Sequence, residues 1–358
     1  MAVHSAASRR FRLAVALATV LAVGSSAPAY GSAASAAARP ADRQLTVGGP
    51  GILLDLTGPA TLRFQATAGQ RLTVLAQRRS LTAVDNTDLT IVRDGRTVAE
   101  GTLIVTWASV SVDFTAPAAG SYTVRINPRT AKDRGTLLVS LAGAATGTVT
   151  LRGPARTVTI GRPGERAFLT FQATAGQHLT VVARRGTLSK DEYTYLDVRG
   201  PSGELNMSGA VGYESDYRTL DFDVTETGRH TIEVNPDTDR TGTVTVQLTG
   251  SVTATLTPGK PARITFGQPG ERAYVTFHAA EAEQFQLTAR PETLTTKSNT
   301  LLRVRTPAGL DVVDATMTAA KPTAVLAFSS SAGTYTIEID PEGLDSGTLL
   351  LNLRRLNR

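Results

Sequence analysis

Apolar and polar residues alternate in short segments along most of this 358-residue chain. Residues 60–66 are typical, because their apolar side chains all fall on one face: Ala60, Leu62, Phe64 and Ala66. Alternation with a period of two predicts a β-strand with one buried face, and a shift of one residue would turn every apolar side chain toward water. No 11-residue window after the N-terminal leader has apolar residues at helical spacing. The pattern therefore predicts an all-β protein.

The alternating pattern occurs three times along the chain. The segment FQATAGQ at 64–70 returns at 171–177 and, more diverged, at 277–283, at intervals of about 107 residues. A second segment, which reads GSYTV in the first copy, keeps step with it at 120–124, 228–232 and 333–337. Solenoid repeats are about 20–50 residues long, whereas about 100 residues form a β-sandwich domain. The sequence therefore predicts whole domains in tandem.

Turn residues separate the predicted strands in each copy. One strand of every copy ends at an Asx-Pro pair: Asn127-Pro128, Asn235-Pro236 and Asp340-Pro341. Proline cannot donate to a strand ladder, and the Asx side chain can cap the turn. Many short strands with regular turn signals indicate a sandwich or barrel. We predict three tandem jelly-roll-like antiparallel β-sandwich domains, over residues 42–143, 144–250 and 251–358.

The N-terminal residues have a different composition. A basic stretch at 9–12 precedes an apolar run at 13–23, and the Ala-Pro-Ala at 27–29 is typical of a cleavage site for signal peptidase. The apolar run is shorter than the roughly 20 residues that a membrane-spanning helix needs. This pattern favours a Sec-type signal peptide over residues 1–29, followed by an Ala/Ser-rich lead over residues 30–41. We therefore expect a secreted, extracellular protein with no membrane span in the mature chain.

Charge and cysteine content narrow the classes of function. The formal net charge is +6, and three of these charges belong to the arginines of the leader, so the rest of the chain is nearly balanced. Nucleic-acid binding would need clustered basic residues with stacking aromatic side chains, which we do not find, so we expect no nucleic-acid partner. The chain has no cysteine, which excludes disulfides, thiol nucleophiles and cysteine metal sites.

Catalytic motifs are missing from the three copies. The histidines of the three copies replace unrelated residue types of the other copies: His178, His230 and His278. None forms a recognisable catalytic motif with a serine or a carboxylate. We find neither G-x-S-x-G nor H-E-x-x-H. The sequence therefore predicts a protein that is not an enzyme. The single tryptophan, Trp107, has apolar neighbours, which predict that it packs into the first domain, and a surface anchor is the alternative.

Tyrosines and acidic residues gather in the second copy, which holds four of the chain's eight tyrosines. Aromatic planes with nearby carboxylates are one way in which sandwich domains hold sugar rings. The alternative is packing at a strand rim, where the ring is buried and the hydroxyl stays wet. The candidate ligand-binding residues are Tyr193, Tyr195, Tyr213, Tyr217, Asp191 and Glu214.

A second candidate site precedes the third strand of the first copy. Asp85, Asn86 and Asp88 offer oxygen atoms of the kind that calcium prefers. Calcium takes about six to eight oxygens, and this run supplies no more than three side-chain donors, so an Asx-rich turn is the alternative. We name Asp85 and Asp88 as candidate calcium ligands and expect no other cofactor.

The order of these segments resembles the bacterial pre-peptidase C-terminal (PPC) domain. The resemblance covers most of each copy and rests on the Ala-Gly-Gln turn at 68–70, on DLTI at 88–91 before the Asp-Gly turn at 94–95, and on FTAPAAGSYTVR at 114–125. It implies a jelly-roll-like sandwich of the type found at the tails of secreted peptidases, here as three divergent copies without a peptidase domain. Such domains are non-catalytic and are associated with secretion, substrate adherence or surface attachment.

The resemblance also implies that acidic residues before the third strand can bind calcium. Asp85 and Asp88 keep this feature in the first copy, whereas the third copy has Lys297, Ser298 and Asn299. We expect a secreted, non-catalytic binding or adherence protein that contacts extracellular polysaccharide, cell wall or a secreted protein. Two alternatives stay open: repeats that serve only as structural spacers, and a secreted hydrolase with a site in the second copy.

Overall fold

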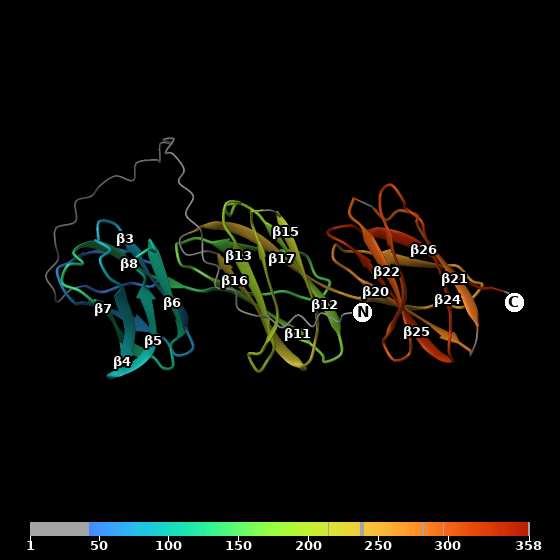
Figure 1. Ribbon diagram of the computed structural model, residues 1–358. Helices are drawn as coiled ribbons and strands as arrows, with labels where there is room; N and C mark the ends of the chain where they lie inside the picture. The colour runs from blue at the N-terminus through green and yellow to red at the C-terminus, as the bar shows by residue number, and fades with distance from the viewer. Residues whose placement is uncertain (1–42, 214, 237–239, 281–282, 296, 357–358) are drawn as a thin grey trace. The chain divides into compact units, whose positions relative to one another are not determined.

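The computed structural model describes residues 43–213, 215–236, 240–280, 283–295 and 297–356 (Figure 1). In these residues the chain is all-β and has no helix, which confirms the predicted fold class. No part of the described chain forms a helix that is long and apolar enough to cross a membrane. The predicted signal peptide, residues 1–29, and the lead at 30–41 lie outside the described residues.

The first sandwich has eight strands in two antiparallel sheets. The strands are β1 (Ile52–Leu56), β2 (Ala60–Ala66), β3 (Arg71–Arg78), β4 (Thr87–Arg93), β5 (Arg96–Leu103), β6 (Ser109–Thr115), β7 (Gly120–Pro128) and β8 (Gly135–Gly143). Their order is β1-β8-β3-β6 in one sheet and β2-β7-β4-β5 in the other. Apart from the hairpin β4–β5, successive strands thus change sheets in the manner of a jelly roll with two Greek keys. The predicted jelly-roll-like sandwich is confirmed.

The second sandwich repeats this arrangement and adds one short strand. Its strands are β9 (Ala145–Thr148), β10 (Arg156–Ile160), β11 (Ala167–Ala173), β12 (His178–Arg185), β13 (Thr194–Arg199), β14 (Leu205–Val211), β15 (Tyr217–Asp223), β16 (Gly228–Pro236) and β17 (Gly242–Gly250). The sheets are β10-β17-β12-β15 and β14-β13-β16-β11-β9. The additional strand, β9, follows the last strand of the first sandwich and pairs in parallel with β11.

The third sandwich follows the plan of the second. Its strands are β18 (Val252–Thr255), β19 (Ala262–Phe266), β20 (Ala273–Ala279), β21 (Gln284–Pro291), β22 (Thr300–Arg305), β23 (Asp311–Met317), β24 (Ala324–Ser329), β25 (Gly333–Pro341) and β26 (Gly347–Arg355). The sheets are β19-β26-β21-β24 and β18-β20-β25-β22-β23. Each of the three sandwiches encloses its own cluster of buried apolar side chains.

The repeated phenylalanine of the sequence lies at the centre of each core. Phe64 stacks on Tyr122 with ring centroids 5.3 Å apart, and Phe277 stacks on Tyr335 at 5.4 Å. In the second sandwich the partner of Phe171 is the fully buried His230, at 5.2 Å. Backbone register explains these pairs, because each phenylalanine lies directly opposite its partner across two antiparallel strands.

Candidate functional site

Three tyrosines of the second sandwich form an exposed cluster. The ring centroids of Tyr193 and Tyr213 are 4.7 Å apart, and those of Tyr193 and Tyr195 are 6.0 Å apart. The three side chains keep 41%, 45% and 57% of their surface exposed, in the order Tyr193, Tyr195, Tyr213. Three partly solvated rings in contact make an aromatic surface, which we call the tyrosine surface.

The hairpin β13–β14 brings the tyrosine surface together. Tyr193 directly precedes β13 and Tyr213 comes two residues after β14, and the antiparallel register pairs Thr194 with Val211 at this end of the hairpin. The backbone N–H of Tyr213 donates to the carbonyl of Lys190 at 2.5 Å. Tyr213 has a φ of +40°, a conformation that is unfavourable for a residue with a Cβ. The loop therefore holds this ring in place against a local backbone cost.

Gly212 allows the two loops to touch. Its φ is +133°, and a Cβ at this position would lie 2.0 Å from the carbonyl oxygen of Glu192. Gly212 also closes a tight turn with Ser215 through two backbone hydrogen bonds of 3.1 and 3.0 Å. Since no other residue tolerates both the approach and the dihedral angle, glycine is required here.

The loop between β12 and β13, which ends at Tyr193, is held differently from the matching loops of the other two sandwiches. Asp133 is buried and accepts the backbone N–H groups of Val84 and Asp85 at 2.7 and 3.1 Å. Asp345 does the same in the third sandwich. The matching residue of the second sandwich is Arg240, which forms an ion pair with Glu192. A surface ion pair thus replaces a buried cap in the sandwich that carries the tyrosine surface.

The other predicted ligand-binding residues lie elsewhere or are engaged. Tyr217 begins β15 in the opposite sheet, and its hydroxyl lies beside Gly343 of the third sandwich, away from the other three tyrosines. Asp191 is exposed in the loop before Tyr193. Glu214 lies outside the described residues. Tyr193, Tyr195 and Tyr213 are therefore the predicted residues that the structure brings together.

Two acids that a hydrolase in the second sandwich could use already have cationic partners. Glu192 pairs with Arg240, and Asp216 pairs with Arg185. A guanidinium thus occupies each of these two carboxylates. A carboxylate that acts as a general acid or base must be available to the substrate instead.

The predicted calcium ligands are also engaged with protein groups. The carboxylate of Asp88 accepts hydrogen bonds from Nε and Nη2 of Arg129, each at 2.9 Å, and from the hydroxyl of Thr102 at 2.9 Å. The hydrogen bonds from Arg129 lower the pKa of Asp88 below its ordinary value. The carboxylate of Asp85 accepts the backbone N–H of the next residue, Asn86, at 2.6 Å. Among the described residues, no three His, Asp or Glu side chains gather as a metal site would require.

Trp107 corrects one expectation from the sequence. It does not pack into the first core, because 53% of its surface is exposed. It lies between β5 and β6, in the loop that corresponds to the Tyr213 loop of the second sandwich. Val84, in the neighbouring loop between β3 and β4, is 58% exposed. The equivalent loops of the first two sandwiches thus both carry exposed aromatic or apolar side chains.

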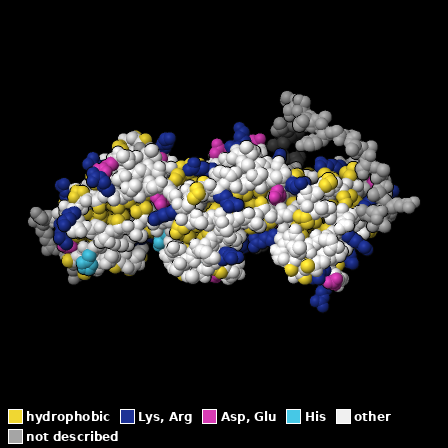
Figure 2. All heavy atoms as spheres, turned by 180° about the vertical axis from the view of Figure 1, so that it is seen from behind, with side chains coloured by type: hydrophobic (Ala, Val, Ile, Leu, Met, Phe, Trp, Pro, Cys, Tyr) yellow, Lys and Arg dark blue, Asp and Glu magenta, His cyan; other side chains and the backbone are white. Residues whose placement is uncertain are grey.

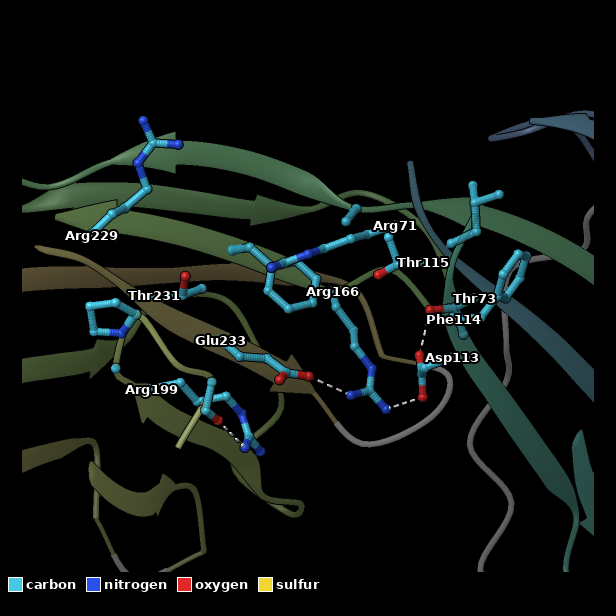
Figure 3. A pocket seen from close by; sticks show the side chains of 16 residues that line it. Arg71, Thr73, Asp113, Phe114, Thr115, Arg166, Arg199, Arg229, Thr231 and Glu233 are labelled. Atoms are coloured by element: carbon cyan, nitrogen blue, oxygen red, sulfur yellow. Dashed lines mark hydrogen bonds and ion pairs between the residues drawn. The ribbon is translucent and has the colours of Figure 1, made fainter. Parts of the chain in front are cut away.

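A set of ion pairs that sequence reasoning missed joins the first two sandwiches (Figure 3). Arg166, before β11, donates to Asp113 of β6 and to Glu233 of β16, the latter at 2.5 Å. The hydroxyl of Thr73 donates to Asp113 at 2.6 Å. Burial raises the pKa of Asp113 above its ordinary value, an effect that the neighbouring Arg166 opposes.

The second joint, between the second and third sandwiches, has the same construction. Arg272 takes the place of Arg166 and contacts Asp221 at 2.8 Å and Glu338 at 3.3 Å. It also contacts Asp340 at 2.8 Å, where the other copies have asparagine. Burial, with the nearby acids Asp221 and Glu338, raises the pKa of Asp340 to about 6 despite this contact.

The joint residues are present where two sandwiches meet and are replaced at the outer faces. The first sandwich has Pro59 and Arg125 where the second has Arg166 and Glu233. The third sandwich has Ala327 where the first two have Asp113 and Asp221. Comparison of the three copies, position by position, was the signal in the sequence that could have revealed the joints.

No protein-family model matches the chain, and no curated protein sequence matches it. Among solved structures, the chain is similar to PliG of Aeromonas hydrophila, a periplasmic inhibitor of g-type lysozyme, with 14% identity over 29% of this chain and 98% of that one, at a TM-score of 0.19. It is similar to ZmpB of Clostridium perfringens, a catalytic M60 domain with two CBM51 domains, with 9% identity over 85% of this chain and 34% of that one, at a TM-score of 0.20. The chain thus spans about a third of that longer protein. These likenesses support no inference about function.

Proposed function

We propose that this chain is a secreted, non-catalytic binding protein that adheres to an extracellular polysaccharide through the tyrosine surface. The observation that carries the proposal is the convergence of Tyr193, Tyr195 and Tyr213 into one exposed cluster. A contiguous cluster of exposed aromatic side chains marks an interaction site more often than scattered single apolar side chains do.

The chemistry of the cluster suits a sugar. Tyrosine offers a large rigid ring at a small cost in side-chain entropy, and its hydroxyl can exchange hydrogen bonds with the hydroxyls of a sugar. The tilts of 44° and 54° between neighbouring rings present faces in different directions, so that successive units of a polymer could each meet a ring. The constrained loop at Gly212 and Tyr213 reduces the ordering that binding requires.

Two features of the sequence support the cellular setting of this proposal. The residues 1–29 have the pattern of a signal peptide, and the three copies resemble PPC domains, which are associated with adherence and surface attachment. On this basis we propose an extracellular location and a place for the chain on polysaccharide or cell wall. Figure 2 shows basic, acidic and hydrophobic side chains interspersed on the face in view.

The test is retention of the mature chain on insoluble glycans and cell-wall fractions. A variant with Tyr193→Ala and Tyr213→Gly should bind at least tenfold more weakly, since the loss of two ring contacts is expected to cost about 1.4 kcal/mol or more. The control is Leu310→Ala, which removes a side chain of the third sandwich that is 67% exposed. Equal retention of all three proteins would contradict the tyrosine surface as the contact site, whereas retention of none would remove the support for adherence and favour the spacer alternative.

A further inference from the structure

The groove between the first two sandwiches contains more arginine than its ion pairs use. Its volume is about 670 Å³, within the range of about 300–1,000 Å³ that is common for ligand pockets. Four arginines line it against two acids: Arg71, Arg166, Arg199 and Arg229, with Asp113 and Glu233 (Figure 3). Arg166 is the cation that holds both acids. The groove therefore keeps a surplus of positive charge.

Two of these arginines carry no ion pair or side-chain hydrogen bond to any residue that the structure describes. They are Arg71 at the start of β3 and Arg229 near the start of β16. Figure 3 shows both outside the chain of ion pairs that runs from Asp113 through Arg166 to Glu233. A guanidinium without a carboxylate partner in a concave site can receive an anion in bidentate geometry.

Arg71 is already held in position for such a contact. Its guanidinium carbon lies 3.9 Å from the centre of the Phe168 ring, which comes from the second sandwich. Stacking covers one face of the guanidinium and leaves the N–H groups at its edge free to donate. The side chain therefore loses less freedom when an anion binds.

The second joint provides an internal comparison, because its groove is lined differently. His178 takes the place of Arg71 and pairs with Asp223, and Thr334 takes the place of Arg229. Arg305, which matches Arg199, contacts Glu338 at 2.8 Å. The second groove thus has no surplus of arginine over acids, although its ion-paired joint is the same. The unpaired arginines are therefore not needed to join two sandwiches.

We propose that the groove between the first two sandwiches binds the carboxylate or phosphate groups of an acidic polysaccharide, with Arg71 and Arg229 as the contact residues. The inference rests on the proposed function only for the class of polymer, a polysaccharide, and it does not depend on the tyrosine surface. Threonine hydroxyls at Thr115 and Thr231, which also line the groove, can accept and donate hydrogen bonds to sugar hydroxyls.

The experiment is affinity electrophoresis of the full mature chain in gels that contain polygalacturonate, a glycerol-phosphate polymer or a neutral glucan. The double variant Arg71→Gln with Arg229→Gln should bind the acidic polymers at least tenfold more weakly. The control, Arg63→Gln with Arg125→Gln, changes net charge equally by removing two exposed arginines of β2 and β7. It should bind within twofold of the unchanged chain.

Retention on one acidic polymer alone supports the proposal and identifies the preferred anionic group. Equal losses in both double variants would overturn it, because net charge and not the groove would then decide binding. Absence of binding to both acidic polymers would also overturn it. A chain that binds polygalacturonate through Arg71 and Arg229, but loses nothing with Tyr193→Ala and Tyr213→Gly, would contradict the tyrosine surface and leave the groove supported.

Discussion

The rings of Tyr193 and Tyr213 lie 4.7 Å apart because they flank the open end of one hairpin. In the first sandwich the residues at these two positions are Asn86 and Val105, and the side-chain oxygen of Asn86 accepts the N–H of Val105 at 2.8 Å. An aromatic contact has thus replaced a polar one at the same place in the fold.

Gly212 and Tyr213 should respond in opposite ways to a change of side chain. Gly212→Ala should lower the free energy of unfolding by about 1–3 kcal/mol and displace the tyrosine surface, because the new Cβ meets the carbonyl of Glu192. Tyr213→Gly should leave stability unchanged or slightly raised, because glycine accepts the φ of +40°. Urea denaturation of both variants measures the difference. Similar losses in the two would show that the loop is not constrained as described.

His230 occupies a position that tyrosine fills better. The hydroxyl of Tyr122 donates to the carbonyl of Ala118 at 2.6 Å, whereas the buried Nε2 of His230 has no hydrogen-bond partner among the described residues. His230→Tyr should therefore stabilise the second sandwich by about 1 kcal/mol, seen as a higher thermal midpoint. The reciprocal change Tyr122→His in the first sandwich should destabilise it. A loss of stability in His230→Tyr would mean that this core cannot accept the phenol.

Asp340 should make the stability of the chain depend on pH. Its pKa is about 6 in the folded chain, against 3.8 for an ordinary aspartate, so the folded state holds a proton that the unfolded state releases between about pH 4 and 6. The contribution of this group to the free energy of unfolding therefore falls as pH rises through that window, by about 1–3 kcal/mol. Asp340→Asn, which restores the residue of the other copies, should remove this dependence and raise the thermal midpoint at pH 7.5.

The control for Asp340 is Asp311→Asn, because Asp311 is an acid of the same sandwich that is 58% exposed at its side chain. It should keep the pH dependence of the unchanged chain between about pH 4 and 6. If both variants flatten the dependence equally, or neither does, the assignment to Asp340 is wrong. Thermal melts at half-unit steps of pH give the comparison.

The joint arginines should couple the unfolding of neighbouring sandwiches. Arg272→Met leaves Asp221, Glu338 and Asp340 without their shared cation, at an expected cost of about 1–3 kcal/mol. Calorimetry should then show the third sandwich unfolding in a separate transition at lower temperature. Arg263→Met breaks an exposed pair with Glu292 and should change stability by less than about 1 kcal/mol. A single unchanged transition for Arg272→Met would contradict the coupling.

Calcium should not stabilise the first sandwich through Asp88. Both oxygens of this carboxylate are taken by Arg129, so the site already has its cation. Thermal midpoints in excess EDTA and in millimolar calcium should agree. A rise with calcium that disappears in Asp88→Asn would show that the ion pair opens to admit the metal and that the prediction from sequence was right.

The alternating pattern was sufficient to predict the strands and the fold class. Residues 60–66 show why: each apolar side chain of this segment must face a core, and a sheet strand is the conformation that places alternate residues on one face. The other two copies alternate in the same way, and their buried phenylalanines recur in register. The position of Trp107 was predicted wrongly, because apolar neighbours in the sequence do not determine whether a side chain in a loop is buried in a core.

The all-β fold and its threefold repetition could be predicted from the sequence, because strand periodicity and turn chemistry are local properties of the chain. The tertiary structure alone decided which side chains meet. It separated Tyr217 from the other three tyrosines, gave Asp88 to Arg129, and set Arg166 between Asp113 and Glu233. These contacts join residues far apart in sequence, and their geometry follows from sheet order and from the approach of one sandwich to the next, which no local pattern encodes.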